Sequence, residues 1–504
     1  MGNTEVMDRV FQKIFGILES FGVNKKNCFT RTDTFEVFAV LVVGFLVRDD
    51  MDGITSIVRA LQLDPCKYES LIHALHSEAW DLEEIRHAWY SIILNTDLLK
   101  KYNGRIVLLG DGCKQYHDGY YMAAVSKLAQ ESETQSKAQF IFGQLFGCVS
   151  VLIEFEGKTF SFPLKMTIQG GLAATAKWEG SVHPYADESH ILQMIRDGID
   201  IVSSLKLPAY YVMDRYFASQ EAFTLIDTLC GKRFLKDESQ TCVRPLEIIT
   251  SLKSGCVGYH ELTDEQLNPK GPGRPAQYGP KFKLTPIFRD RKRFQYADVN
   301  IYGGHERVRL YSDVIYWGRN WYQFIKVVWV ISKRGKAIYI STDLSLTPEQ
   351  IIELYAMRMS CESMYREGKQ VFNTFFGHYW SKSVPKLNRF APSNTPNPLL
   401  SINDPLQQKK ILGNIHAMES HVLVASIAQG IAQLIAIQEP IGGVVQTWEY
   451  KRTYTKKKVS EKSVCAYLRK VLPYLLASDQ SNWLLNAIRS RQRHDIPNLG
   501  DMAS

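Results

Sequence analysis

Three acidic residues stand where carboxylates could hold metal ions for phosphoryl transfer. Asp111 and Asp214 each follow a short apolar run, and Glu362 lies in a third stretch, residues 344–372. Two divalent cations held by carboxylates about 4 Å apart can activate an attacking oxygen and stabilise a leaving one. Aspartate is short enough to work from the end of a strand, whereas glutamate reaches further from a helix. The three acids are therefore candidate ligands of one metal site.

Residues 344–372 are expected to form one helix. Thr347 suits the N-cap, Pro348 suits the first helical position, and Gln350 completes a capping box. Apolar and small residues then recur at helical spacing and predict one buried stripe: Leu354, Met357, Cys361, Met364, Gly368 and Val371.

The other face of this expected helix carries Tyr355, Arg358, Glu362 and Lys369. With the rotation of an α-helix, these four side chains fall within roughly 60° of one another. One interpretation is a solvated face with local ion pairs. The other is a metal-binding carboxylate flanked by phosphate-binding side chains, with Arg358 as a fork and Lys369 as a point charge.

The residues around the two aspartates indicate an α/β domain. The expected order is three strands, a helix, a strand and a helix, at residues 105–109, 140–155, 157–164, 189–203, 209–213 and 218–229. Asp111 and Asp214 would then end the first and fourth strands. In an open α/β sheet, functional groups gather at the carboxyl ends of the strands. Each aspartate alone could instead serve a turn or a helix cap.

The regions on either side have different patterns. Residues 1–98 indicate several helices, which could form a helix-turn-helix DNA reader or a packing module, and residues 35–47 are expected to be a buried helix. Residues 231–341 indicate a mostly β insertion around a Gly- and Pro-rich loop. A polar linker at residues 391–404 leads to a helical tail.

Charge and cysteine content narrow the classes of partner and compartment. The 504-residue chain has a net charge of +8, and its cations gather at residues 270–293, 451–458 and 489–493. Such clusters favour a polyanionic partner. Nine cysteines without a C-x-x-C pair argue against a zinc site and a disulfide framework, and favour a reducing compartment. We expect no signal peptide and no membrane partner, and hence a cytoplasmic, nucleoid-associated protein.

The chain resembles the DDE transposases of bacterial insertion sequences, in the cut-and-paste group that carries a Tyr-(2)-Arg-(3)-Glu-(6)-Lys signature. The charged face described above matches that spacing at all of its positions. Gly110-Asp111-Gly112 is similar to the family's first acidic motif, and Met213-Asp214-Arg215-Tyr216 to its second. The resemblance covers about residues 100–385.

This resemblance implies a ribonuclease-H-like (retroviral integrase-type) core interrupted by a β insertion. It implies an enzyme that uses two Mg²⁺ ions, which Mn²⁺ can replace, held by Asp111, Asp214 and Glu362. The implied reaction cuts transposon ends at inverted repeats through a hairpin intermediate, and joins the freed 3′-OH to target DNA. The implied partners are double-stranded DNA and a second copy of the chain, which pair in a DNA synapse.

The resemblance also divides the chain. A helical DNA-end-binding domain at residues 1–98 precedes the first part of the core at 99–230, the insertion at 231–341, the closing helix at 342–390 and a helical, dimerising region at 391–504. Two alternatives stay open: a ribonuclease-H-like nuclease without strand transfer, and a DNA-binding protein that has lost transposition. The intact acids weigh against the latter, because carboxylates repel phosphate and a pure binder does not need them.

Further residues are expected at the DNA. Tyr355, Arg358 and Lys369 would bind phosphates of the transposon end. Arg274, with Lys270 nearby, resembles the core of a minor-groove hook, and a plain phosphate-contacting loop is the alternative.

A hairpin requires a sharp DNA bend, eased by a flipped base stacked on an aromatic ring of the insertion. The candidates, whose default role is core packing, are Trp317, Trp321, Trp329 and Tyr339. The remaining polar residues near the acids are expected to be structural or phosphate-contacting: Lys114, His117 and His190.

Overall fold

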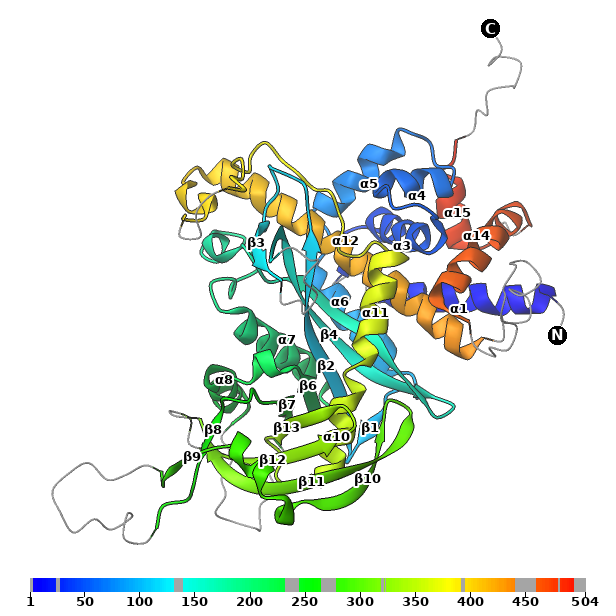
Figure 1. Ribbon diagram of the computed structural model, residues 1–504. Helices are drawn as coiled ribbons and strands as arrows, with labels where there is room; N and C mark the ends of the chain where they lie inside the picture. Colours follow the sequence, from blue (N-terminus) through cyan, green and yellow to red (C-terminus); the bar gives the residue numbers. More distant parts are fainter. Residues whose placement is uncertain are drawn as a thin grey trace.

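A large mixed sheet runs through the middle of the molecule, and helices from both ends of the chain gather on one side of it (Figure 1). The computed structural model describes residues 3–23, 28–130, 139–231, 244–263, 278–318, 321, 323–390, 395–439, 459–478 and 481–493. Lys270 and Arg274 of the expected hook, and the basic cluster at 451–458, lie outside these residues.

The first part of the sheet has five main strands whose spatial order differs from their order in the chain. Across the sheet they are β5 (Lys158–Ile168), β4 (Phe140–Phe155), β2 (Arg105–Tyr116), β6 (Ala209–Met213) and β7 (Leu246–Ser251). β5, β4 and β2 pair antiparallel, whereas β2, β6 and β7 pair parallel. Helix α7 (His190–Leu205) leads from β5 to β6, and α8 (Gln220–Cys230) leads from β6 to β7. The short strands β1 (Lys101–Tyr102) and β3 (Ser126–Ala129) pair with β2 and β4.

β4, β6, α7 and α8 confirm the elements predicted around the aspartates. The prediction that Asp111 ends its strand is wrong. β2 continues to Tyr116, because its second half pairs with β4 from Leu108↔Val151 to Tyr116↔Gly143. Asp111 therefore lies within a strand. β7 falls inside residues 231–341, the expected insertion, yet it extends the parallel part of the sheet beside β6.

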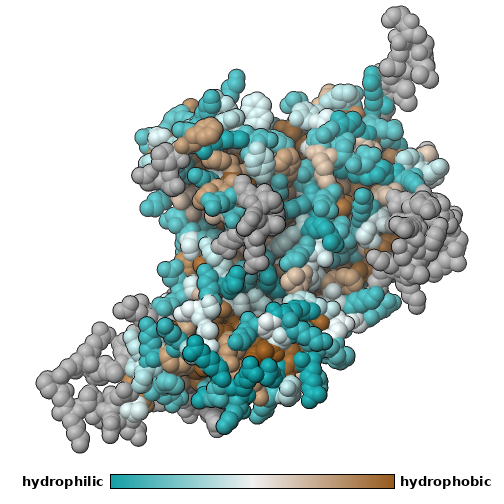
Figure 2. Space-filling view, viewed as in Figure 1, coloured by the Kyte–Doolittle hydropathy of each residue, from teal (hydrophilic) through white to brown (hydrophobic). Residues whose placement is uncertain are grey.

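The sheet continues beyond β7 into a curved, β-rich part that wraps around α10 (Pro348–Met357) (Figure 1). The connection is β13 (Gly335–Ser341), which pairs antiparallel with β7. The remaining strands are β12 (Gln323–Ser332), β11 (Gly304–Trp317), β10 (Gln295–Ile301), β8 (Val257–Tyr259) and β9 (Lys281–Lys283). Short 3₁₀ helices are η1 (Ala173–Thr175), η2 (Arg215–Phe217), η3 (Thr285–Arg289), η4 (Arg291–Arg293) and η5 (Pro398–Ser401). Figure 2 shows hydrophobic residues in the hollow between α10 and this sheet.

Helices from the two ends of the chain pack together. The N-terminal ones are α1 (Asn3–Val23), α3 (Thr32–Val47), α4 (Ile54–Ala60), α5 (Lys67–His76) and α6 (Leu82–Leu94). The C-terminal ones are α12 (Pro405–Gln438), α14 (Glu461–Ser478) and α15 (Trp483–Arg489). α12 is central, because it contacts β5 as well as α3, α5, α6 and α14. The buried α3 confirms the helix predicted at residues 35–47.

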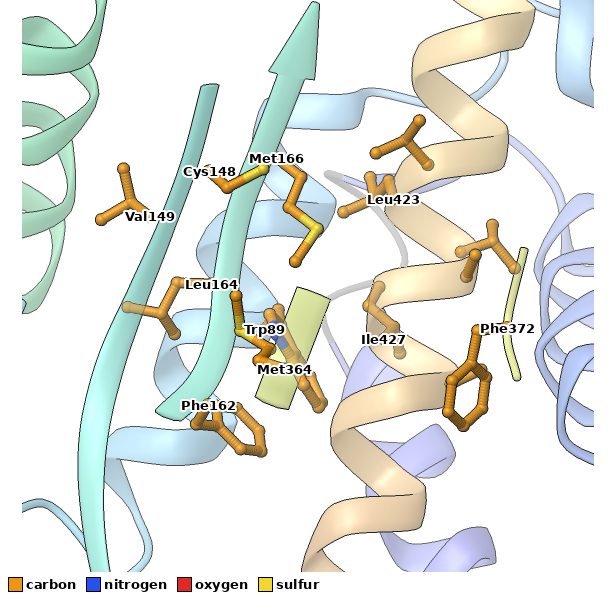
Figure 3. Packing of buried hydrophobic residues seen from close by; sticks show 14 of the residues in the cluster. Trp89, Cys148, Val149, Phe162, Leu164, Met166, Met364, Phe372, Leu423 and Ile427 are labelled. Atoms are coloured by element: carbon orange, nitrogen blue, oxygen red, sulfur yellow. The ribbon is translucent and has the colours of Figure 1, made fainter. Parts of the chain in front are cut away.

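The main apolar core lies between the β4–β5 face of the sheet and α12 (Figure 3). Trp89 of α6 stacks on Phe162 of β5 at 5.2 Å between ring centroids, and its Nε1 donates to the Pro163 carbonyl at 2.9 Å. Gly430 lets α12 approach this ring, because a Cβ there would lie 2.4 Å from Trp89 Cζ2. The core thus joins both ends of the chain to the sheet.

α12 is the one described helix that is long and apolar enough to cross a membrane, by length and composition. Its apolar window is completely buried inside the structure, as in a core helix of a soluble protein, so it is weak evidence for a span.

Candidate active site

Asp111 and Asp214 lie side by side on neighbouring parallel strands. β2 and β6 pair in register from Ile106↔Ala209 to Gly110↔Met213, so the residue that follows the last pair is an aspartate in both segments. β6 ends at this point, and Asp214 caps η2 by accepting a hydrogen bond from the Tyr216 amide at 2.8 Å. The prediction that Asp214 follows the end of a strand is therefore confirmed.

The glycines on either side of Asp111 are required by close packing. A Cβ at Gly110 would lie 2.5 Å from the Tyr211 hydroxyl, and a Cβ at Gly112 would lie 2.8 Å from Nε2 of His190. The Gly112 amide donates to Asp111 Oδ1 at 2.8 Å. Both glycines thus make room for the groups that surround the aspartate pair.

Arg358 reaches the aspartates from the C-cap of α10. Its Nη1 donates to Asp111 Oδ2 at 2.8 Å, and both side chains are mostly buried. Burial raises the pKa of Asp111 to about 6, the nearby Asp214 acts in the same direction, and Arg358 opposes the rise. The sequence-predicted Asp111, Asp214 and Arg358 therefore form one half-buried cluster.

The prediction of a single helix over residues 344–372 is wrong. The chain forms α10, whose capping box at Thr347 is confirmed, and then α11 (Ser360–Gln370). Between them, the amides of Arg358, Met359 and Glu362 bond to carbonyls three residues back, which makes a turn tighter than an α-helix. This turn separates α11 from α10.

α11 is held against the sheet by its buried stripe. Cys361 Sγ lies 3.7 Å from Ser150 Oγ on β4, and Ser161 of β5 is 3.9 Å from the same sulfur. On the other side, Gln429 of α12 donates to the Met364 carbonyl at 2.8 Å. These contacts fix the helix that carries Glu362.

Glu362 itself is exposed on α11. Within the described residues, no ion pair reaches its carboxylate, and the oxygens of Asp111, Asp214 and Glu362 do not all lie within 4.8 Å of one another. The structure thus brings two of the three predicted acids together and leaves the third on the neighbouring helix.

Tyr355 and Lys369 both reach strands around the aspartates. The Tyr355 hydroxyl lies 3.1 Å from Ser251 Oγ on β7, and its ring centroid is 4.5 Å from that of Tyr339 on β13. Lys369 is exposed, and its Nζ donates to the Lys114 carbonyl on β2 at 3.3 Å. Its ammonium group therefore stands at the solvent side of β2.

The aromatic candidates of the β-rich part separate into two kinds. Trp317, Trp321 and Trp329 are buried. The Trp321 Nε1 donates to Asp227 at 2.5 Å, and the Trp329 Nε1 donates to the Leu284 carbonyl at 2.9 Å. Tyr339 is only partly buried, and it packs against the apolar cluster that contains Val328 of β12 and Leu354 of α10.

The two histidines near the acids are buried. His117 stacks on Phe376 at 5.3 Å, and burial lowers its pKa to about 4. Burial, assisted by Lys114, lowers the pKa of His190 to about 4 as well. Both imidazoles are therefore neutral at pH 7 and offer no charge to a phosphate. Lys114 is exposed and donates to the Ala129 carbonyl.

Sequence reasoning missed two residues beside the site. Thr250 of β7 donates to the Asp214 carbonyl at 2.6 Å, and Ser251 contacts Tyr355. No motif marks them, and their strand lies in the region expected to be an insertion. Two arginines of the basic cluster at 489–493 make contacts within the fold, since Arg491 pairs with Glu36 at 3.0 Å and Arg489 donates to the Leu476 carbonyl.

Comparisons with known proteins found one similar solved structure and no matching protein family. No protein-family model matches the chain, and no curated protein matches it. A solved structure, the piggyBac transposase synaptic complex with hairpin DNA, is similar at 11% sequence identity. The match covers 98% of this chain and 87% of that one with a TM-score of 0.31. At such a TM-score, neither the fold nor the function of this chain follows from the likeness.

Proposed function

We propose that the protein is a DDE-type DNA transposase. The observation that carries the proposal is the register of β2 and β6, which places Asp111 beside Asp214 where their parallel pairing ends. The segment from Tyr355 to Lys369, which resembles the family's signature, lies beside the two aspartates, because Arg358 donates a hydrogen bond to Asp111.

The strand order supports a ribonuclease-H-like core. An antiparallel trio, β5, β4 and β2, continues into the parallel pair β6 and β7, and α7 and α8 make the crossovers. The β-rich part then intervenes before the helix with Glu362. This is the order that the resemblance implies.

The aspartate pair fits divalent cations. Two adjacent carboxylates, one of them with a raised pKa, form a place where a hard cation would be stabilised. We propose that Asp111 and Asp214 hold Mg²⁺, and that the long, exposed side chain of Glu362 completes the ligand set. Bound there, the metal would activate the attacking oxygen and stabilise the leaving one.

The remaining side chains would position DNA. In the free protein, Arg358 neutralises Asp111. With a cation held by the aspartates, the guanidinium would be available as a fork for a phosphate of the transposon end. Lys369 adds a point charge at the solvent side of β2, and Tyr355 borders the same space.

For the flipped base, we propose Tyr339. Its ring is partly exposed and lies beside Tyr355, whereas the three tryptophans are buried, and two of their indoles donate hydrogen bonds within the fold. A base stacked on Tyr339 would lie close to Tyr355, one of the residues proposed to bind phosphates of the transposon end.

The test uses the DNA that flanks the gene, in which paired inverted repeats would identify the substrate. Duplexes that end in such a repeat are incubated with the full chain and Mg²⁺ or Mn²⁺, and the products are resolved on denaturing gels. Asp111→Asn and Asp214→Asn are compared with Asp298→Asn, an exposed acid on β10.

Joined products that only the two site variants lose would support the transposase. Cleavage without joining would instead assign a nuclease, and tight binding without any metal-dependent product would assign a DNA-binding protein. Because both transposon ends are processed together, we also propose a dimer on DNA, which ultracentrifugation of the protein with and without end duplexes would detect.

A further inference from the structure

A second cluster of charged residues lies away from Asp111, in a cavity of about 700 Å³ between α6, α7, β5 and α12. Glu83 and His87 of α6 and Asp200 of α7 line it, and their ligand atoms lie within 4.8 Å of one another. The positions of Glu83 and His87 place both side chains on one face of α6.

The cavity contains more negative than positive charge. Its lining has three cations, Arg86, Lys165 and Arg196, and six carboxylates, those of Glu78, Asp81, Glu83, Asp197, Asp200 and Glu419. Lys165 Nζ lies 2.9 Å from Asp200 Oδ2 and 3.2 Å from Asp197 Oδ1, and Arg86 Nη2 lies 2.9 Å from Glu419 Oε2. A divalent cation would neutralise the remaining excess.

Unpartnered polar atoms line the same cavity. His416 is 8% exposed and Gln169 is 6% exposed, yet His416 Nε2 and Gln169 Oε1 lack a hydrogen-bond partner among the described residues. The Gln169 amide nitrogen donates to Asp197, so its oxygen faces away from that carboxylate. His87 Nε2 is likewise a buried atom without a partner. Buried polar groups of this kind are normally satisfied, which indicates that the cavity takes a ligand.

We propose that Glu83, His87 and Asp200 bind one divalent transition-metal cation such as Zn²⁺. An imidazole with two carboxylates is a ligand set that Zn²⁺ accepts, with a further position for water from the cavity. Donor atoms around a tetrahedral Zn²⁺ lie roughly 3.4 Å apart, so small side-chain movements suffice. The Glu83 and Asp200 side chains are 50% and 37% exposed, so an ion can enter from solvent.

Such an ion would connect α6 to α7, and hence the N-terminal helices to the sheet that carries Asp111 and Asp214. The site uses no cysteine, so the spacing of the cysteines has no bearing on it. It is also independent of the proposed transposase activity, because its ligands lie on other elements.

The test is metal binding by the full chain, in an Asp111→Asn/Asp214→Asn background that removes the proposed catalytic ions. Chelator-stripped protein is dialysed against buffered Zn²⁺, and the bound metal is counted by atomic emission. Co²⁺, whose visible spectrum reports four-coordinate geometry, serves as a second probe. The variants are His87→Ala and Asp200→Asn, and the matched control is His73→Ala on α5, an exposed helical histidine.

We expect one ion per chain, bound about tenfold or more weakly in His87→Ala and Asp200→Asn and unchanged in His73→Ala. No bound ion, or equal binding in all variants, would overturn the proposal. Circular dichroism checks the fold of each variant. If His87→Ala is unfolded, Glu83→Gln replaces it, because this substitution keeps the size of the side chain and its hydrogen bond to Arg86 while it removes a carboxylate ligand.

Discussion

The Arg358 guanidinium and the Asp111 carboxylate form an ion pair that joins the turn between α10 and α11 to the middle of β2. Asp111 keeps a raised pKa in spite of this partner, because burial and Asp214 outweigh it. Arg358 alone therefore does not compensate the negative charge of the two aspartates, and a metal ion would supply the remaining positive charge.

Replacement of the third acid tests its place in the site. We expect Glu362→Gln to abolish cleavage while end binding persists, because the side chain is exposed on α11 and its loss leaves the packing intact. Gel assays of cleavage and mobility-shift assays of binding provide the measurements. The matched control is Glu367→Gln, further along the same helix, and substantial cleavage by Glu362→Gln would remove Glu362 from the site.

Substitutions of Arg358 and Lys369 should differ in their effects on the free energy of unfolding. Lys369→Ala should change the unfolding free energy by less than about 0.5 kcal/mol, because Lys369 is exposed. Arg358→Ala should lower it by about 1–3 kcal/mol, because Asp111 loses its partner. Denaturant titrations measure both changes.

On DNA, these two variants should behave alike. Each should weaken end binding and reduce the slope of log K against log[salt] by about 1, since each removes one phosphate contact. An unchanged slope would show that the side chain does not touch phosphate. Arg307→Ala on β11 serves as a control for the loss of a cation elsewhere.

The pKa of Asp111 gives a pH dependence to the stability of the metal-free protein. Because this pKa is raised from 3.8 to about 6, the folded chain binds the proton more tightly than the unfolded chain does. The contribution of Asp111 to the free energy of unfolding is therefore greatest below about pH 4. It falls by on the order of 3 kcal/mol as the pH rises through about 6.

Asp111→Asn does not titrate, so its stability relative to the unchanged chain should increase between these pH values and stay level above them. Loss of the Arg358 bond adds an offset that does not vary with pH. Urea titrations in the presence of a chelator measure the difference, and a difference that is flat from pH 4 to 7 would contradict the assignment.

Tyr339 can be tested by its effect on one reaction step. Tyr339→Leu should reduce hairpin formation more than initial nicking, because stacking of a base on an aromatic ring is worth about 1–3 kcal/mol. Denaturing gels separate the nicked and hairpin products. Tyr296→Leu on β10, whose side chain is 66% exposed, is the control. Equal loss of both products would point to a packing role for Tyr339.

Local sequence patterns predict much of the part that carries the aspartates. The run that forms β6 is wholly buried, so its apolar residues stand out, and α7 has a clear helical period. The second half of β2 gives no such signal, because polar residues such as Lys114 and Gln115 pair with β4 along the sheet. Its length depends on a partner strand that is distant in the sequence.

Long-range contacts also decide the features of the site that the sequence does not show. Nothing in the sequence around Met359 breaks a helix, and the turn arises where α10 and α11 contact different parts of the sheet. The cluster of Glu83, His87 and Asp200 comes from two helices that are far apart in the chain, so no motif could identify it. Two of its three members are common surface residues when read alone.

The turn between α10 and α11 has a mechanical consequence. α10 contacts mainly β10 and β13 of the β-rich part, and also β6 and β7, whereas α11 contacts β5, β2 and α12. Arg358 is therefore connected through α10 to the β-rich part, and Glu362 is connected through α11 to the helical core. If bound DNA displaced the β-rich part, the separation of Arg358 and Glu362 would change, because only the short turn between α10 and α11 joins the two side chains.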